Sequence, residues 1–143
     1  MTDFVLDASV AVKWFLPPEH EQLTEEAVAF YRKLVQRETQ FVVPDLFWAE
    51  VASALRKAVR LERFRRSSAE EAITHLLQCD LPTYPTADLL GRAFHIAMAY
   101  DCSVYDSLYV ALAVRTNLQL MTADERLAKS LAAYFPVKLL GAV

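Results

Sequence analysis

Short apolar runs alternate along the chain with longer segments in which apolar residues recur every three to four positions. The short runs have the length and composition of buried strands, which are predicted over Phe4–Leu6, Phe41–Val43, Leu81–Tyr84, Leu118–Met121 and Val137–Leu140. The run Leu81–Tyr84 contains Pro82 and is followed by Pro85, so we expect it at an edge of the sheet.

The longer segments predict helices between these strands. They cover Val10–Phe15, Glu19 to about Arg37, Leu46 to about Val59, a helix beginning at Ser67 or Ser68, Ala87–Tyr100, Tyr105 to about Arg115, and a last helix after Thr122. Capping boxes are expected at two helix starts, with Glu70 or Glu71 in one and Glu125 in the other. The alternation indicates an α/β fold: a mainly parallel four- to five-stranded sheet with helices on both faces, in a single domain over residues 1–143.

Composition narrows the class of protein without pointing to a function. The chain has 143 residues, of which 55% are hydrophobic and only two are glycine, so long regular elements and a large core are expected. Its net charge of −3 gives no global attraction for nucleic acid, so such a contact would need a local basic patch. The two cysteines, Cys79 and Cys102, match no metal-ligand spacing and are expected to be reduced, buried and structural. Neither a signal peptide nor a membrane-spanning run is evident, which favours a cytoplasmic protein with no membrane partner.

Two acidic residues interrupt helical segments that are otherwise apolar. Glu50 lies three residues after Phe47 and four before Ala54, on or beside the apolar stripe of its helix. Asp106 stands in the first turn of a segment that is apolar on almost every side. Each has a structural interpretation, because Glu50 can reach water from the edge of the stripe and Asp106 complements the helix dipole.

Two further acids follow predicted strands. Asp7 comes directly after Phe4–Leu6, and Asp124 follows the strand that ends at Met121. Each of them also fits the start of a helix as a structural residue. Taken with the other two acids they indicate a site, because the carboxyl ends of parallel strands share one edge of the sheet. Four acids are then expected in one crevice.

Four ionised carboxylates in one crevice need a compensating charge. Two like charges about 4 Å apart repel by roughly 4 kcal/mol at an effective dielectric constant of about 20. Either some of the acids are therefore protonated or a divalent cation binds between them. A ligand set made only of oxygens suits Mg²⁺ or Mn²⁺ rather than Zn²⁺. Because Mg²⁺ commonly takes phosphate oxygens as further ligands, the pattern favours phosphoryl chemistry.

The ordered set of motifs resembles the PIN domain family, in particular the single-domain VapC-type toxins of VapBC toxin–antitoxin pairs. The likeness covers nearly the whole chain and rests on four stretches: Val5–Ser9, Glu50 inside the third helix, Tyr105–Ala113, and Leu120–Asp124. It implies a three-layer α/β/α PIN domain, Mg²⁺- or Mn²⁺-dependent cleavage of RNA, a homodimer, and inhibition by a small antitoxin protein. The family's acidic quartet then corresponds to Asp7, Glu50, Asp106 and Asp124, with supporting hydroxyl groups at Ser9 and Thr122.

This resemblance leads to a hypothesis for the mechanism. Asp7, Asp106 and Asp124 hold one or two metal ions, and Glu50 is a further ligand directly or through water. A water activated at the metal attacks phosphorus in line, which leaves a 5′ phosphate and a 3′ hydroxyl. Ser9 and Thr122 orient carboxylates or water on this hypothesis, and helix capping is their alternative role.

A basic cluster follows Glu50 along the third helix and beyond it. Its members are Arg56, Lys57, Arg60, Arg63, Arg65 and Arg66. These side chains could contact an RNA backbone, contact an acidic segment of an inhibitor, or form a solvated face. The sequence leaves the three interpretations open.

Two other functions fit part of the pattern. A phosphatase with Asp7 as nucleophile would normally carry a second Asp two residues on, where this chain has Ser9. The main alternative is a non-catalytic PIN-like module that only binds protein or RNA, although degenerate members usually lose acids and this chain keeps four. A nuclease assay with Mn²⁺, run with and without EDTA, separates the enzyme from the binding module.

Overall fold

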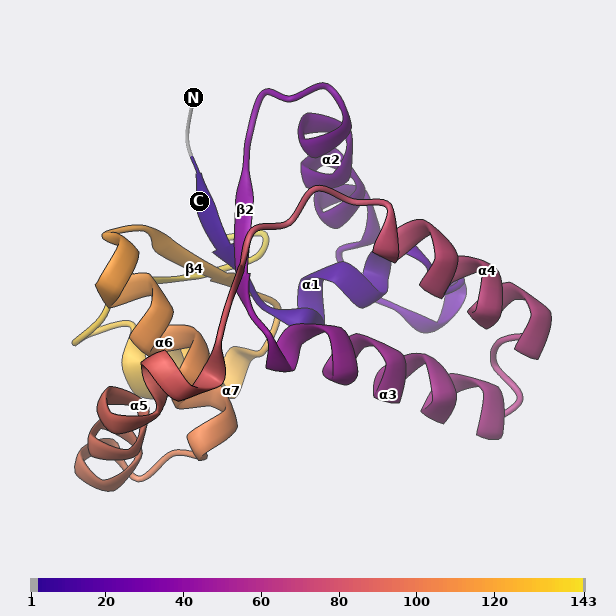
Figure 1. The fold of residues 1–143 in the computed structure, drawn as a ribbon. Helices are drawn as coiled ribbons and strands as arrows, with labels where there is room; N and C mark the ends of the chain where they lie inside the picture. The colour runs from indigo at the N-terminus through magenta and orange to yellow at the C-terminus, as the bar shows by residue number, and fades with distance from the viewer. Residues whose placement is uncertain (1–2, 143) are drawn as a thin grey trace.

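A five-stranded parallel sheet forms the centre of the computed structural model, which describes residues 3–142 (Figure 1). Its strands are β1 (Phe4–Leu6), β2 (Phe41–Pro44), β3 (Thr83–Tyr84), β4 (Gln119–Thr122) and β5 (Val137–Leu139). They lie in the order β3-β2-β1-β4-β5, and every neighbouring pair is parallel. The predicted fold class is confirmed, and β3 occupies an edge of the sheet as its prolines predicted.

Helices cover both sides of this sheet. They are α1 (Ala8–Ala11), α2 (Thr24–Val35), α3 (Leu46–Arg60), α4 (Arg66–Leu77), α5 (Thr86–Tyr100), α6 (Val104–Thr116) and α7 (Glu125–Leu131), with 3₁₀ turns at Val12–Trp14 and Pro18–His20. Helix α6 packs on β1, β2 and β4 and carries α5 on its outer side, whereas α1 to α4 lie on the opposite side in Figure 1. The result is the three-layer α/β/α arrangement.

The core is built around β1 and α6. All three residues of β1 are buried, as expected for a central strand with neighbours on both edges. Every residue from Ser107 to Ala113 on α6 is buried as well, which fits a helix enclosed between the sheet and α5. The hydroxyl of Ser107 lies 3.1 Å from the Cys102 thiol, so the polar atom inside this apolar helix has a partner.

The first two predicted helices begin at other residues than expected. Helix α1 starts at Ala8, directly after the strand, and tightens into a 3₁₀ turn from Val12. Helix α2 starts at Thr24 rather than Glu19, because the chain after Pro17 forms a separate 3₁₀ turn and Leu23 then adopts φ 58°. A left-handed residue cannot continue a right-handed helix, so the two segments stay distinct.

Both predicted capping boxes are wrong. Helix α4 begins at Arg66 with Arg65 in the N-cap position, and Glu70 forms an exposed ion pair with Arg66 at 2.9 Å instead of capping the backbone. Helix α7 is capped by Asp124, because the Thr122 hydroxyl is engaged in the centre of the fold. The Thr122 hydroxyl shows that a tertiary partner can take the side chain that a local motif requires.

Two other expectations can be compared with the structure. Cys79 and Cys102 are free thiols, but each is half-buried rather than buried. Among residues 3–142, no helix combines the length and the apolar character needed to cross a membrane.

Candidate active site

The candidate site lies at the carboxyl ends of β1 and β4. The two strands are paired in register, Leu6 beside Met121, and the Asp7 N–H continues the ladder by donating to the Met121 carbonyl at 3.0 Å. Within the sheet, β1 has β2, the next strand in the chain, as one neighbour and β4 as the other. This is a topological switch point, where the first turns after two adjacent strands diverge and leave a crevice for a ligand.

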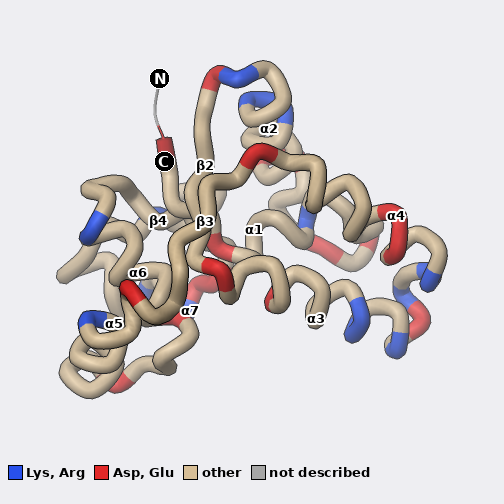
Figure 2. The backbone as a smooth tube through the Cα atoms, in the orientation of Figure 1, with Lys and Arg blue, Asp and Glu red and all other residues tan. Residues whose placement is uncertain are grey.

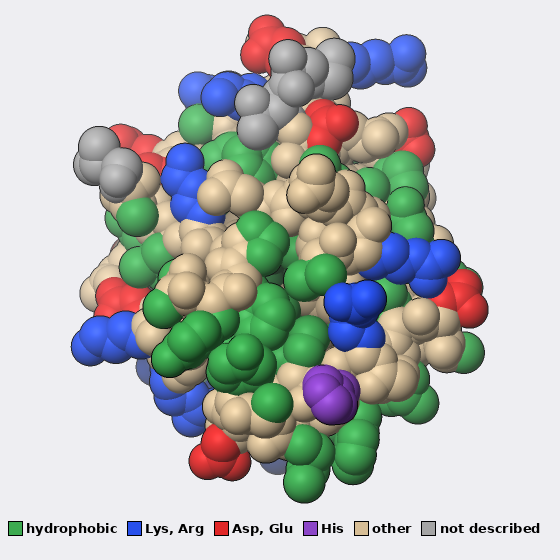
Figure 3. Space-filling model, turned by 90° about the vertical axis from the view of Figure 1, so that its left-hand side faces the viewer, with side chains coloured by type: hydrophobic (Ala, Val, Ile, Leu, Met, Phe, Trp, Pro, Cys, Tyr) green, Lys and Arg blue, Asp and Glu red, His purple; other side chains and the backbone are tan. Residues whose placement is uncertain are grey.

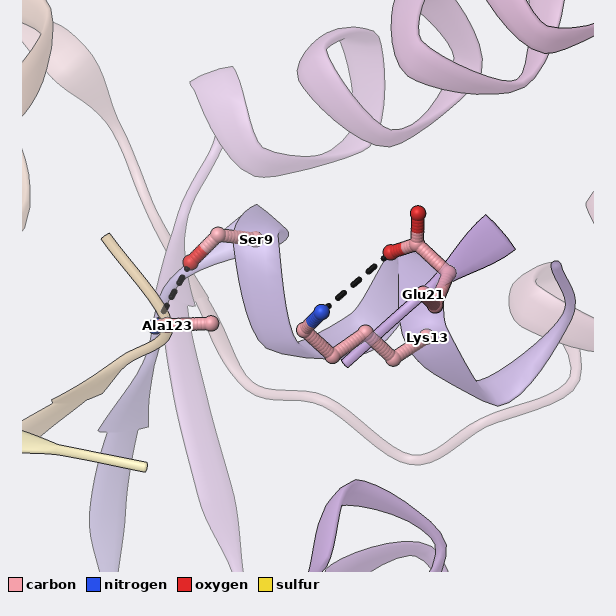
Figure 4. Close-up of polar contacts among 4 residues, drawn as sticks. All are labelled: Ser9, Lys13, Glu21 and Ala123. Carbon is pink, nitrogen blue, oxygen red and sulfur yellow. Dashed lines mark hydrogen bonds and ion pairs between the residues drawn. The ribbon is translucent and has the colours of Figure 1, made fainter. Parts of the chain in front are cut away.

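Asp7 is held in this crevice by two hydroxyl groups. Its Oδ2 atom accepts hydrogen bonds from Ser9 Oγ and Thr122 Oγ1, both at 2.7 Å, and only 7% of the residue is exposed. Ser9 Oγ in turn accepts from the backbone N–H of Ala123 at 2.9 Å, which joins the start of α1 to the end of β4 (Figure 4). Asp7 occupies the N-cap position of α1 without capping it, so its interpretation as a capping residue is wrong.

The environment of Asp7 favours its neutral form. Burial raises the pKa of Asp7 to about 6. The hydroxyls of Ser9 and Thr122 oppose this rise in the pKa, while the carboxylates of Glu50 and Asp106 add to it. A carboxylate placed where it is hard to ionise is characteristic of functional sites.

Glu50 reaches toward the site from α3. It is half-buried at the edge of the apolar stripe, and its Oε1 atom accepts a 2.6 Å hydrogen bond from the hydroxyl of Tyr109 on α6. Burial raises the pKa of Glu50, the Tyr109 hydrogen bond lowers it, and the Asp106 carboxylate raises it further. Burial and nearby carboxylates also raise the pKa of Tyr109 well above its usual value, so the hydroxyl remains a donor.

Asp106 is the electrostatic centre of the four acids. It lies in the first turn of α6, whose start is capped by Ser103 Oγ accepting from the Asp106 N–H at 3.0 Å. Burial raises the pKa of Asp106, the Asp124 carboxylate raises it further, and Ser103 and Arg126 lower it. Since the Asp106 carboxylate also acts on Asp7 and Glu50, it interacts with each of the other three acids.

Asp124 follows β4 and has a structural task besides its charge. Its Oδ1 atom accepts from the backbone N–H groups of Arg126 at 2.9 Å and Leu127 at 3.2 Å, which caps α7. Its own N–H donates to Thr122 Oγ1 at 3.0 Å. Thr122 therefore joins two acids, because the same hydroxyl oxygen donates to Asp7 and accepts from Asp124.

The donor set of this crevice suits a hard divalent cation. It offers carboxylate and hydroxyl oxygens, and three of its acids have pKa values raised by burial and by one another. Over residues 3–142, no three acidic, histidine or cysteine side chains converge closely enough to form a ready-made metal centre. The fit to Mg²⁺ or Mn²⁺ therefore rests on the chemistry of the oxygen donors.

The basic cluster begins in the C-terminal part of α3 and continues into the segment that follows this helix. Arg56, Lys57 and Arg60 line a surface depression of about 660 Å³ together with Glu50, so this depression connects basic side chains to one of the acids. Arg63 does not line this depression but shares a neighbouring one with Lys57 and Pro17. In Figure 2 the blue segments gather at the far end of α3, whereas red segments gather near the ends of the central strands.

Sequence reasoning missed two residues of the site. Tyr109 was counted only as an apolar member of α6, and Ser103 was not considered. Tyr109 lies one helical turn after Asp106, and a tyrosine buried on an otherwise aliphatic helix needs a partner for its hydroxyl. That spacing was the available signal, but the partner, Glu50, is 59 residues away in the chain.

The fold and the position of the acids define a class of protein: a parallel α/β domain with carboxylates at the switch point of its sheet. Comparisons with known proteins identify the family. Residues 4–130 match the PIN domain family, and the chain belongs to that family. Ribonuclease VapC3 of Pyrobaculum aerophilum is 31% identical over 131 residues, which cover 90% of this chain and 95% of that protein.

Two solved structures share the fold. The crystal structure of PAE2754 from Pyrobaculum aerophilum superposes with a TM-score of 0.65 at 22% identity, covering 90% of this chain and 79% of that one. A toxin–antitoxin complex from Klebsiella pneumoniae gives a TM-score of 0.61 at 16% identity, covering 98% and 99% of the two chains. At these identities the likeness supports the fold alone.

Proposed function

We propose that this protein is a single-domain endoribonuclease that depends on Mg²⁺ or Mn²⁺ and is inhibited by a small antitoxin. The observation that carries the proposal is Asp7, a buried carboxylate with no capping role, which Ser9 and Thr122 hold where the charges of Glu50 and Asp106 raise its pKa. The similarity of this chain to a protein named Ribonuclease VapC3 supports RNA as the substrate. A chain of the same fold occurs in a solved toxin–antitoxin complex, and we include a protein inhibitor in the proposal by analogy with it.

Asp7, Asp106 and Asp124 would hold the cation, with Glu50 as a further ligand directly or through water. When bound, the cation supplies positive charge for the phosphoryl oxygens and lowers the pKa of a water. Ser9 and Thr122 fix the orientation of the Asp7 carboxylate, and Tyr109 fixes that of Glu50. Such hydrogen bonds from surrounding residues keep metal-binding groups in position and reduce the reorganisation that binding requires.

The RNA backbone is proposed to follow the depression along α3. Phosphates are attracted to Arg56, Lys57 and Arg60, and the same depression reaches Glu50 at the acidic site. The cations thereby offset the repulsion between a polyanionic substrate and a cluster of carboxylates. An acidic segment of the antitoxin would meet the same charges, which would place inhibitor and substrate in competition.

Cleavage by matched variants tests the proposal. Asp106→Asn should abolish Mn²⁺-dependent cleavage of single-stranded RNA, whereas Asp88→Asn should cleave like the parent protein. The control is close, because Asp88 and Asp106 are both the third residue of their helices, α5 and α6. EDTA should stop the parent protein, and the product ends should be 5′ phosphate and 3′ hydroxyl. RNA binding without cleavage by the parent would instead favour the non-catalytic module.

A homodimer is proposed through the exposed face of α5. Leu90, Phe94 and Met98 are spaced four residues apart and form an apolar stripe on this helix, each at least 46% exposed. Hydrophobic side chains gather on the α5 side of the molecule in Figure 3. An apolar stripe on one helix can pack against its own copy about a two-fold axis.

The mass in solution tests this interface. Phe94→Glu should convert a dimer to a monomer in light scattering, and Leu77→Glu should leave the dimer intact. Leu77 is a matched control, since it is also an exposed apolar residue on a helix but lies on α4. A monomeric parent, or equal effects of the two variants, would contradict the proposed interface.

A further inference from the structure

Arg126 presents an uncommitted positive charge next to the acidic site. It belongs to the first turn of α7, where its backbone N–H donates to Asp124 while the residue itself is exposed. Among residues 3–142, its guanidinium takes part in neither an ion pair nor a side-chain hydrogen bond. A guanidinium near carboxylates that pairs with none of them is free to bind an anionic ligand.

This side chain lines a depression of its own. The depression has a volume of about 330 Å³ and is bounded by Asp101, Cys102, Asp106, Arg126, Leu127, Ser130 and Leu131. Arg126 is the only cation among these residues, and Asp106 is the wall that the depression shares with the acidic site. The charge of Arg126 acts on Asp106, where it lowers the pKa that burial and Asp124 raise.

The acidic site therefore adjoins two depressions that contain basic side chains. One holds Glu50 together with Arg56, Lys57 and Arg60, and the other holds Asp106 together with Arg126. The two have no lining residue in common, and each contains a different member of the acidic quartet. A strand that crosses the acids from one depression to the other would meet a positive charge before and after the reacting phosphate.

We propose that Arg126 binds a backbone phosphate of the RNA on the side of the scissile bond opposite to the phosphates bound along α3. The inference rests on the proposed function and adds the direction of the strand: from the α3 depression, across the four acids, into the Arg126 depression. Arginine suits this task because its planar guanidinium donates two parallel hydrogen bonds to a phosphate. Arg126 is thus a positioning residue, which holds the substrate and leaves the chemistry to the acids.

RNA binding by charge variants is the first test. Measurements use a short single-stranded RNA that spans a cut site mapped with the parent protein, in an Asp7→Asn background that cannot cleave it. Arg126→Gln should weaken binding by about five- to tenfold and reduce the slope of log affinity against log salt by about 0.7, the value for one phosphate contact on a single strand. Lys129→Gln, on the same helix but outside the depression, should change neither quantity.

Neutral methylphosphonates at single positions of the RNA locate the contact. A methylphosphonate at one position should weaken RNA binding to the protein that retains Arg126 and should not affect binding to the Arg126→Gln variant. The position at which a methylphosphonate loses its effect in Arg60→Gln should lie on the other side of the mapped cut. Two positions on the same side, or no position silenced by Arg126→Gln, would overturn the proposed path.

The outcomes separate this inference from the proposed function. If Asp106→Asn is inactive but Arg126→Gln binds RNA with unchanged affinity and salt slope, only the Arg126 inference falls. A loss of cleavage by Arg126→Gln without any change in binding would make Arg126 a counter-charge for Asp106 and also overturn it. A parent protein that neither binds nor cuts RNA would refute both. Thermal unfolding of each variant confirms that the fold is intact.

Discussion

Asp7 and Asp124 occupy equivalent positions but perform different structural tasks. Each follows one of two adjacent parallel strands, and each stands at the N-cap position of the next helix. Asp124 caps α7 with two backbone hydrogen bonds, whereas Asp7 caps nothing and accepts from two side-chain hydroxyls. The same residue type at the same place in two βα units therefore serves local structure in one unit and not in the other.

The difference shows how a site residue can be told from a structural one. A carboxylate that caps a helix stabilises the fold whether or not a ligand binds, as Asp124 does. A carboxylate that is buried without a structural task destabilises the empty fold, as the raised pKa of Asp7 indicates. Asp7 therefore gives the stronger signal of function, although Asp124 is the more conspicuous residue in the local structure.

The largest expected effect is on RNA cleavage and should be the same at Asp7 and Asp124. Asp7→Asn and Asp124→Asn should each reduce Mn²⁺-dependent RNA cleavage at least about a hundredfold, because both remove a charge from the proposed metal site. Single-turnover cleavage of a labelled RNA measures the loss. If one variant retained the rate of the parent protein, the two acids would not share a chemical role.

The second effect concerns Asp7 alone and the pH dependence of stability. Its folded-state pKa of about 6 lies above the ordinary value of 3.8, so its contribution to stability is fully present below about pH 4 and is lost as the pH rises through 6. The metal-free parent should lose up to about 3 kcal/mol over this range relative to Asp7→Asn. Urea unfolding in EDTA at several pH values measures the gap, and a gap that does not vary with pH would argue against a buried charge.

The third effect tests the residue that joins the two acids. Thr122→Val removes the donor to Asp7 and the acceptor for the Asp124 N–H, so the free energy of unfolding should fall by about 2 kcal/mol. Thr122→Ser keeps the hydroxyl and should recover most of that stability together with RNA cleavage. A larger loss in Thr122→Ser than in Thr122→Val, measured by urea unfolding and cleavage rate, would mean that the methyl group rather than the hydroxyl matters.

The smallest effect separates capping from charge at Asp124. Asp124→Ala should be about 1 kcal/mol less stable than Asp124→Asn, since asparagine retains an oxygen that caps α7. Asp7→Ala cannot serve as the control for capping, because alanine there also leaves the hydroxyls of Ser9 and Thr122 without their acceptor. Thermal unfolding of the two Asp124 variants measures the difference, and equal stability of Asp124→Ala and Asp124→Asn would contradict a cap from this side chain.

The sequence predicted the sheet well because its strands are short apolar runs bounded by polar or proline residues. The parallel arrangement followed from the alternation with helices, and it placed Asp7 and Asp124 at one edge. Glu50 and Asp106 stood out because each interrupts an apolar helical pattern. For these residues, the local sequence pattern was enough to predict where the side chain lies in the fold.

Helix starts and hydrogen-bond partners were less predictable. Thr122 and Glu125 have the spacing of a capping box, but the Thr122 hydroxyl instead donates to a carboxylate 115 residues earlier in the chain. The position of Tyr109 one turn after Asp106 was a local signal, but nothing in the local sequence identifies its partner Glu50. The unpaired guanidinium of Arg126 is likewise evident only in the folded structure. Contacts between distant segments decided these roles.

The position of β1 has a consequence for how the protein is made. Strand β1 leaves the ribosome well before its neighbour β4, which spans Gln119–Thr122 and lies more than 100 residues later in the chain. Asp7 cannot accept the hydrogen bond from the Thr122 hydroxyl until β4 has been made. A nascent chain that stalls before residue 119 carries three of the four acids but lacks β4 and Thr122, so the proposed site cannot assemble until synthesis has passed this strand.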